Sequence, residues 1–418
     1  MQSASSVHTL RIIMFWTVVS VACVAAARQP LNYNNTGVEA YKAGRYEEAI
    51  AHFEQAYDMA PESPVVRRNL CNAYQSHANA LAREGAFRAA IPYLEGAVRV
   101  DPHNASPLIQ LGSYYLRMDD VNAAILHLEE AIQLKPGDLD AHDLLGQAYY
   151  MDNDLSSARA QWEYVLEMDP GRNNLAERYE KAFREESVEY DFSRWKSRHF
   201  RISYPPDVPQ RLRSNVFSIL DRAYIDIGRK FGGVFPPPPI HVILYTADQF
   251  AEATQLEGHI GAVYDGKIRS PLTDADGTWL PEDELQRRLV HEYVHVVVRH
   301  IGGANVPWWL NEGLAETLSK PLGDNDAERL RVMYENGAAF SLTELEANQI
   351  NALPPDMLRL AYVQSHATVD FLWRRYGSSR VKGFLQALGN GMSPEQAFSA
   401  TYRGGYATLE RDVAAQYR

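Results

Sequence analysis

Residues 291–295 read His-Glu-Tyr-Val-His, and this short stretch decides the fold of the carboxyl-terminal half of the chain. His291 and His295 are four positions apart, so on a helix they lie one turn apart on the same face and can both reach one metal ion. Glu292 stands beside the first histidine, where a carboxylate can take a proton from a metal-bound water. This HExxH spacing therefore predicts a helix that holds a metal ion for hydrolysis.

A third ligand comes from residues 308–316, which read Trp-Trp-Leu-Asn-Glu-Gly-Leu-Ala-Glu and place Glu312 seventeen positions after His295. Three protein ligands leave the fourth position of a tetrahedral zinc ion open, which is typical of a catalytic rather than a structural site. The only cysteines of the chain are Cys23 and Cys71, which excludes a closed, cysteine-rich zinc site.

The residues around the motif are apolar: Leu289, Val290, Val294, Val296, Val297 and Val298. They indicate a buried helix, in which two histidines and a glutamate are costly unless they are paired or bound to a metal. The alternative, a solvated helix face that carries the motif by chance, fits this context poorly. His300 follows His295 by five positions, about 140° around a helix, so we expect it at the surface or capping the helix end.

Together the two segments resemble the gluzincins, the zinc peptidases that include thermolysin and the zinc aminopeptidases. They are most similar to bacterial peptidase-MA-like domains, which are often fused to helical repeats. The resemblance implies a thermolysin-like domain with a small mixed sheet and a helical carboxyl-terminal lobe. It also implies that His291, His295 and Glu312 bind Zn²⁺, that Glu292 is the general base, and that Glu316 orients His291. The gap between His295 and Glu312 is slightly shorter than in thermolysin, which indicates a trimmed connection.

Further along, residues 362–365 read Tyr-Val-Gln-Ser and open an apolar helical pattern that ends at Gly377. Related domains have a Tyr-x-Gln-Ser segment here, and in zinc aminopeptidases a tyrosine at a comparable distance donates to the oxyanion of the tetrahedral intermediate. Tyr362 is therefore predicted as a catalytic donor, with His366 as the second candidate. The alternative is an aromatic side chain packed on the core. The Gly-x-Met-Glu-Asn segment of the aminopeptidases is missing from the sequence, which favours an endopeptidase.

The catalytic domain is expected to span residues 198–418, with residues 198–280 as its amino-terminal lobe. This lobe should contain strands at 199–204 and 240–245, a helix at 212–231, and a hairpin at 261–269 that turns at Asp265-Gly266. Related gluzincins have an edge strand that borders the cleft and pairs with the substrate backbone. We assign the hairpin to that edge, and a plain surface hairpin is the alternative.

The amino-terminal half contains a repeat with a period of 34 residues, in which small, aromatic and proline positions recur: Gly112 as Gly146, Tyr115 as Tyr149, Ala124 as Ala158, Leu128 as Trp162 and Pro136 as Pro170. This pattern matches tetratricopeptide (TPR) repeats. Two earlier copies are spaced by 41, so one helix or loop is longer by seven residues. We expect an all-α solenoid over residues 28–171 whose groove binds a peptide or protein partner. A role as a spacer or buttress is the alternative.

Residues 1–27 resemble a signal peptide, because Arg11 is followed by an uncharged run of 16 residues that ends in three alanines. We therefore expect an exported protein, periplasmic or extracellular. An uncleaved membrane anchor, the only membrane association expected, and a lipid on Cys23 are alternatives. Cys71, in a repeat helix, is expected to be buried and inert.

The net charge of −12 and the pI of about 5.6 exclude the basic surface that nucleic-acid binding needs. Residues 172–197 are highly charged and predict a solvated helical linker between the two domains. The chain is thus expected to be an α+β protein, a repeat solenoid followed by a metallopeptidase. Two rival functions remain open: a repeat-based scaffold with a peptidase-like binding domain, and a zinc hydrolase for non-peptide amides such as cell-wall cross-links.

Overall fold

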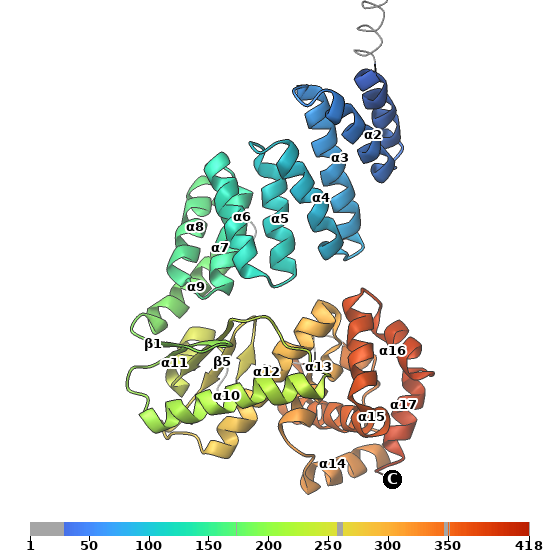
Figure 1. Ribbon diagram of the computed structural model, residues 1–418. Coiled ribbons are helices and arrows are strands. Elements are labelled where there is room, and N and C mark those ends of the chain that lie inside the picture. Colours follow the sequence, from blue (N-terminus) through green and yellow to red (C-terminus); the bar gives the residue numbers. More distant parts are fainter. Residues whose placement is uncertain (1–28, 173, 257–261, 347–349, 351, 418) are drawn as a thin grey trace, which may run out of the picture. The chain divides into compact units, whose positions relative to one another are not determined.

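The computed structural model describes residues 29–417 except 173, 257–261, 347–349 and 351 (Figure 1). The chain divides between residues 172 and 173 into two compact units. The predicted signal peptide and Cys23 lie outside the described residues. Within the described part, no helix has both the length and the apolar character needed to cross a membrane.

The first unit consists of antiparallel helix pairs, which confirms the predicted all-helical repeat array. A helix over residues 29–42 is followed by seven more, whose bounds are α2 (Tyr46–Met59), α3 (Pro64–Arg83), α4 (Phe87–Val100), α5 (Ala105–Arg117), α6 (Val121–Leu134), α7 (Leu139–Met151) and α8 (Leu155–Met168). The seven extra residues of the second repeat lie in α3, which has 20 residues where α5 and α7 have 13 each. Cys71 is a buried free cysteine, as expected.

The recurring glycines of the repeats are sites where two helices touch. A Cβ atom on Gly112 would lie 2.4 Å from Cγ of Leu128, and one on Gly146 would lie 2.4 Å from Nε1 of Trp162. Such distances are too short for any side chain, so the glycine of one helix receives the large side chain of the next. This contact explains why a small and a bulky residue recur sixteen positions apart.

The second unit is built on one five-stranded mixed sheet with the strand order β1-β2-β3-β5-β4. The strands are β1 (Ser193–Lys196), β2 (Phe200–Tyr204), β3 (Ile240–Tyr245), β4 (Val263–Tyr264) and β5 (Ile268–Pro271). The central pairs β2–β3 and β3–β5 are parallel, and the outer pairs β1–β2 and β4–β5 are antiparallel. The predicted strands at 199–204 and 240–245 and the predicted hairpin are confirmed, and β4 lies at an edge of the sheet.

Helices cover both faces of this sheet. α10 (Gln210–Lys230) and α12 (Glu282–Gly302) pack on the face that carries Val242, Leu244 and Ile268 (Figure 1). α9 (Leu175–Glu189) and α11 (Ala247–Thr254) pack on the opposite face, against Ile243 and Tyr245. The alternation of side chains along β3 thus explains why this strand is buried from both sides.

The rest of the unit is helical and packs with α12 into one large core. It contains η1 (Gly303–Asn305), α13 (Trp308–Ser319), α14 (Asp324–Glu335), η2 (Glu344–Glu346), α15 (Pro355–Gly389), α16 (Pro394–Tyr402) and α17 (Tyr406–Ala414). α15 is broken at Gly377, whose φ of 77° is outside the helical region, and a second helix continues directly from it. The helix end predicted at Gly377 is therefore a kink between two consecutive helices.

The expected solvated linker over residues 172–197 is wrong. α9 is indeed a helix, but its Glu185 is fully buried and pairs with Arg269 of β5. Residues 193–196 form β1 and pair with β2. The charges of this segment suggested exposure because a sequence does not reveal that two of its carboxylates have buried cationic partners elsewhere in the chain.

Candidate metal centre

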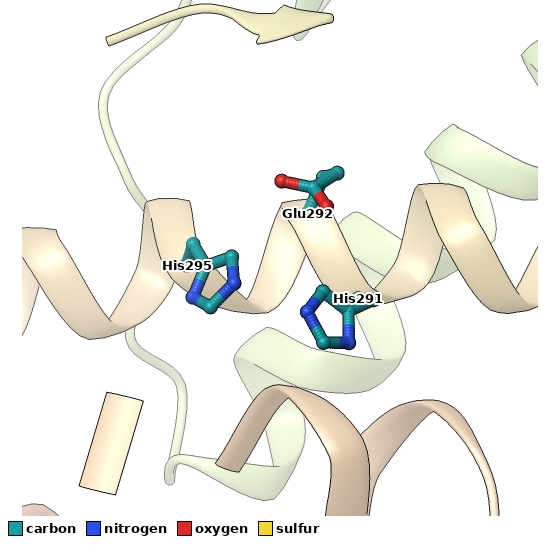
Figure 2. Close-up of side chains that lie close together, drawn as sticks. All are labelled: His291, Glu292 and His295. Carbon is teal, nitrogen blue, oxygen red and sulfur yellow. The ribbon is translucent and has the colours of Figure 1, made fainter. Parts of the chain in front are cut away.

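α12 buries its motif because an apolar face of the helix, including Leu289, Val294 and Val298, packs into the core of the second unit. On this helix the side chains of His291, Glu292 and His295 gather (Figure 2), and the nearest ligand atoms of the three lie within 4.8 Å of one another. All three side chains are largely buried, and Glu292 is only 4% exposed. The four-residue spacing therefore has the geometric result expected from the sequence.

Glu312, on α13, faces both histidines. Its Oε2 lies 3.5 Å from Nε2 of His291 and 3.6 Å from Nε2 of His295. One carboxylate oxygen of Glu312 thus lies within 3.6 Å of a ring nitrogen of each histidine, between two helices. The donor set of two imidazoles and a carboxylate suits a zinc ion with an open coordination position.

Glu316, one turn after Glu312, lies behind the first histidine. Its Oε1 is 3.5 Å from Nδ1 of His291, the ring nitrogen that points away from Glu312. Its Oε2 pairs with Lys320 at 2.8 Å. A carboxylate on the far nitrogen favours a proton there, which leaves the lone pair of Nε2 free for a metal.

Asn311 plays the corresponding part for His295, and sequence reasoning missed it. Its Oδ1 lies 3.0 Å from Nδ1 of His295, so Nδ1 carries the proton and Nε2 is the basic nitrogen. Its Nδ2 donates to Oε1 of Glu312 at 3.3 Å. One amide thus orients two of the three converging residues. The available signal was its place directly before Glu312 in the quoted segment.

Glu292 has an unusual environment for a carboxylate. Burial, against the opposing effect of His295 and with a smaller contribution from the charge of Glu312, raises its pKa to about 7. Among the described residues, its Oε2 has no hydrogen-bond partner. A buried polar atom without a partner costs free energy, which is consistent with a ligand or water at this point.

Glu312 is buried as well, which alone would raise its pKa. The charges of His295 and His291, with hydrogen bonds from His291 and Asn311, outweigh burial and lower the pKa. Glu312 is therefore ionised and Glu292 is close to half protonated near neutral pH, although the two residues lie in the same site. An anionic ligand beside a carboxylate that titrates near neutrality fits a metal-assisted hydrolytic centre.

Tyr362 lies in the same region on α15. Burial raises its pKa above the usual range, and the charges of Glu312, Glu316 and Glu292 raise it further. Its hydroxyl therefore keeps its proton at neutral pH and can donate. Its ring packs edge-on against Trp308, with ring centroids 4.9 Å apart, so the core-packing role and the donor role are compatible.

His366, the second candidate donor, is almost fully buried, and burial lowers its pKa. Its Nδ1 lies 4.0 Å from Oε2 of Glu316. The structure thus places it beside the carboxylate behind His291. His300 is exposed in the last turn of α12, away from the converging ligands, as expected.

The hairpin lies next to the motif helix. Both β4 and β5 contact α12, and a strand passes on the Glu292 side of that helix (Figure 2). β4 pairs with β5 on one side only, so its other side is a sheet edge. This is the position in which an extended peptide could be added as a further strand.

Comparison with known families finds a match in each half of the chain. Residues 282–416 match the Peptidase MA superfamily, and residues 40–80 and 109–173 match tetratricopeptide repeats. The chain contains TPR repeats and a Peptidase MA superfamily domain. The superfamily match begins at the first residue of α12 and includes α13 and α15, so it covers every candidate site residue.

A curated relative is the TPR repeat-containing thioredoxin TTL4 of Arabidopsis thaliana, which is 36% identical over 80 residues. The similarity covers 19% of this chain and 11% of the relative, so the chain spans about a tenth of that protein.

Solved structures with weak similarity include the MamA protein, at 23% identity over 38% of this chain and 82% of that chain, with a TM-score of 0.31. A thermophilic TPR protein of Thermus thermophilus is 23% identical over 37% of this chain and 98% of that chain, with a TM-score of 0.23. At these values the likeness carries no conclusion about function.

Proposed function

We propose that this chain is an exported, zinc-dependent metallopeptidase of the endopeptidase type, with a repeat domain that binds a peptide or protein. The observation that carries this proposal is the convergence of Nε2 of His291, Nε2 of His295 and Oε2 of Glu312 beside the buried carboxylate of Glu292. The Peptidase MA superfamily match over the same residues supports it.

Three residues would hold the cation: His291, His295 and Glu312. A divalent zinc ion there would lower the pKa of a water molecule and polarise the carbonyl of the scissile bond. Asn311 would fix the tautomer of His295 through its hydrogen bond to Nδ1, and the carboxylate of Glu316, 3.5 Å from Nδ1 of His291, would favour a proton on that nitrogen. The two helices thus present their ligand atoms already oriented.

Glu292 would act as general base and then as general acid. A pKa of about 7 lets its carboxylate accept a proton from the attacking water near neutral pH. The same proton then passes to the leaving amine. Because Glu292 has an Oε2 with no partner among the described residues, it is free to make this contact.

Tyr362 would donate a hydrogen bond to the oxyanion that forms at the attacked carbonyl. Its raised pKa keeps the hydroxyl protonated, and the effect of the Glu312 and Glu292 charges on that pKa supports a position near the proposed centre. A donor aimed at a developing negative charge is a large contributor to catalysis.

The repeat domain is proposed to bind a peptide or protein partner, because TPR repeats are known to do so. The partner, the natural substrate and the cleavage specificity have no readable signature in the chain. The proposed export rests on residues 1–27 alone.

The decisive experiment compares the native protein with Glu292→Gln in zinc analysis and in a peptide-cleavage screen. Both proteins should hold one zinc ion per chain, because Glu292 is not a ligand. Hydrolysis by Glu292→Gln should fall by about 10²–10⁴-fold, the usual contribution of a general base. Glu282→Gln, on the exposed first turn of the same helix, is the matched control and should be fully active.

The same comparison separates the rival functions. A scaffold with a peptidase-like binding domain would bind its partner equally well with or without the Glu292 carboxylate. If native protein hydrolyses no peptide and cells tolerate Glu292→Gln, the scaffold function is correct. Hydrolysis of cell-wall amides but not of peptides would show that the protein is a hydrolase for non-peptide amides.

A further inference from the structure

A cluster of buried charges joins α9 to the β4–β5 hairpin, on the face of the sheet opposite α12. Arg269 of β5 is fully buried and donates to Oε2 of Glu185 at 2.8 Å and, through Nη1, to Oε1 of Glu189 at 3.4 Å. Tyr245 of β3 donates to the same Glu189 oxygen at 2.5 Å and accepts from Arg269 at 2.6 Å. The guanidinium is thus held by two carboxylates of one helix.

The turn of the hairpin is held by the same helix. Lys181, one turn before Glu185, pairs with Oδ2 of Asp265 at 2.8 Å, and Oδ1 of Asp265 accepts from Nε of Arg269 at 3.3 Å. Three residues on successive turns of α9, namely Lys181, Glu185 and Glu189, therefore contact the hairpin from its turn to its second strand.

The hairpin needs this contact because it carries two buried cations. Lys267 is 1% exposed, and burial followed by the nearby charge of Arg269 lowers its pKa to about 8. The carboxylates of Glu185 and Glu189 counteract this effect. Without these two carboxylates, two cations would be buried close together with no matching anions on α9. A hairpin with two paired residues on each strand cannot keep such charges buried.

The other side of the hairpin faces the core that contains α12. Ile268 is fully buried in the core that contains α12, and Tyr264, its partner in β4, packs against the same core. Val263 and its partner Arg269 point the opposite way, towards α9. The hairpin is thus fixed between the helix of the metal motif and the helix that follows the repeats.

We propose that Glu185, Glu189 and Arg269 are positioning residues that fix the edge strand β4 for an extended peptide substrate. This inference rests on the proposed peptidase function, and it gives α9 a part in substrate binding. Peptide binding then depends on residues directly after the repeat unit, outside the Peptidase MA superfamily match.

The test uses the full-length, zinc-loaded protein with Glu185→Gln, and with Lys181→Met as a milder variant at the rim of the cluster. Glu180→Gln, an exposed position on α9, is the control. Hydrogen exchange of the amides of residues 262–270 should become about tenfold faster or more in Glu185→Gln, since one partner of a buried charge pair is lost. Zinc content and the exchange of residues 291–295 should stay native.

Kinetics then separate positioning from general stability. On a peptide that the native protein cleaves, Glu185→Gln should raise KM by about tenfold with kcat within about twofold of native. If the hairpin amides exchange at the same rate in Glu185→Gln, Lys181→Met and native protein, the proposal is overturned. Faster exchange of these amides with an unchanged KM would also overturn it. If Glu185→Gln does not fold, the same measurements on Lys181→Met test the proposal, with smaller expected increases in amide exchange and KM. A native protein that cleaves nothing would remove the proposed function, and hairpin exchange alone would then decide whether α9 holds β4.

Discussion

Gly313 directly follows Glu312, and it is a point of very close contact between α13 and α15. A Cβ atom at this position would lie 2.5 Å from the backbone oxygen of Ser365 and 2.5 Å from Cγ2 of Val369. The oxygen belongs to a helix backbone and cannot turn away as a side chain could. Gly313→Ala must therefore push the two helices apart.

The size of the effect follows from two opposing terms. Overpacking of a rigid contact costs about 1–3 kcal/mol, with this site at the upper end because one of the clashing atoms is backbone. Alanine returns about 1 kcal/mol through its higher helix propensity. The net loss of unfolding free energy should be about 2 kcal/mol, or a melting temperature lower by roughly 4–8 °C for a unit of this size. Because Glu312 moves with α13, zinc affinity should also fall by about tenfold.

The assay is thermal unfolding together with zinc titration against a chelator, with Gly383→Ala as the control. Gly383 lies within α15, and a Cβ there would meet nothing within 4 Å. The control should be more stable by about 0.5–1 kcal/mol, since alanine only improves the helix. A Gly313→Ala protein as stable and as rich in zinc as the native protein would refute the argument from helix contact.

Three further changes test the site and the charge cluster. Tyr362→Phe should lower kcat by about 10²–10³-fold with little change in KM or zinc content; full activity would limit Tyr362 to packing. Asn311→Leu should weaken zinc binding by about 10–100-fold in a chelator competition, because the tautomer of His295 is no longer set; unchanged affinity would contradict this role. Burial alone would raise the pKa of Asp265, but the charge of Arg269 and other cations lowers it from 3.8 to about 2. Its ionised form therefore stabilises the fold above pH 4, by about 2 kcal/mol, and this contribution is lost as pH falls from about 4 to about 2. Denaturant unfolding should show Asp265→Asn less stable than the native protein by about 2 kcal/mol at pH 6 and by about 1 kcal/mol at pH 3. A stability difference that is the same at both pH values would exclude the ionisation of Asp265 as its cause.

Periodicity in the sequence predicted much of the fold because it reflects contacts between neighbouring elements. The glycine and bulky positions of the repeats predicted helix pairs, and the structure shows that these residues touch. The run at 240–245 predicted a strand, and β3 has these bounds. Even the extra seven residues of the second repeat were expected, although only the structure places them in α3.

The segment 172–197 shows where this reasoning fails. Its charged residues indicated a solvated helix, yet Glu185 and Glu189 are buried against Arg269, about eighty positions later. A buried ion pair between distant parts of the chain leaves no periodic pattern in either segment. A single sequence cannot tell such a carboxylate from an exposed one.

Only part of the candidate site could be predicted, again because some of its contacts join separate helices. His291 and His295 are four residues apart on one helix, so spacing alone brings them together. Glu312 lies on another helix, so the sequence offered it as a third ligand but did not fix its position, and the structure places it beside both histidines. Asn311 was missed because an asparagine has no distinctive pattern, and its contact with His295 depends on how α13 packs against α12.

The meeting of ligand atoms from α12 and α13 also bears on how long the protein survives. A cation bound there would tie residues 291 and 312 together in the folded chain and have little affinity for the unfolded one. By mass action, such binding adds about 4 kcal/mol to stability when free zinc exceeds its dissociation constant a thousandfold. The resistance of the protein to unfolding, and to proteases that attack unfolded chains, would then rise and fall with the zinc supply of its compartment.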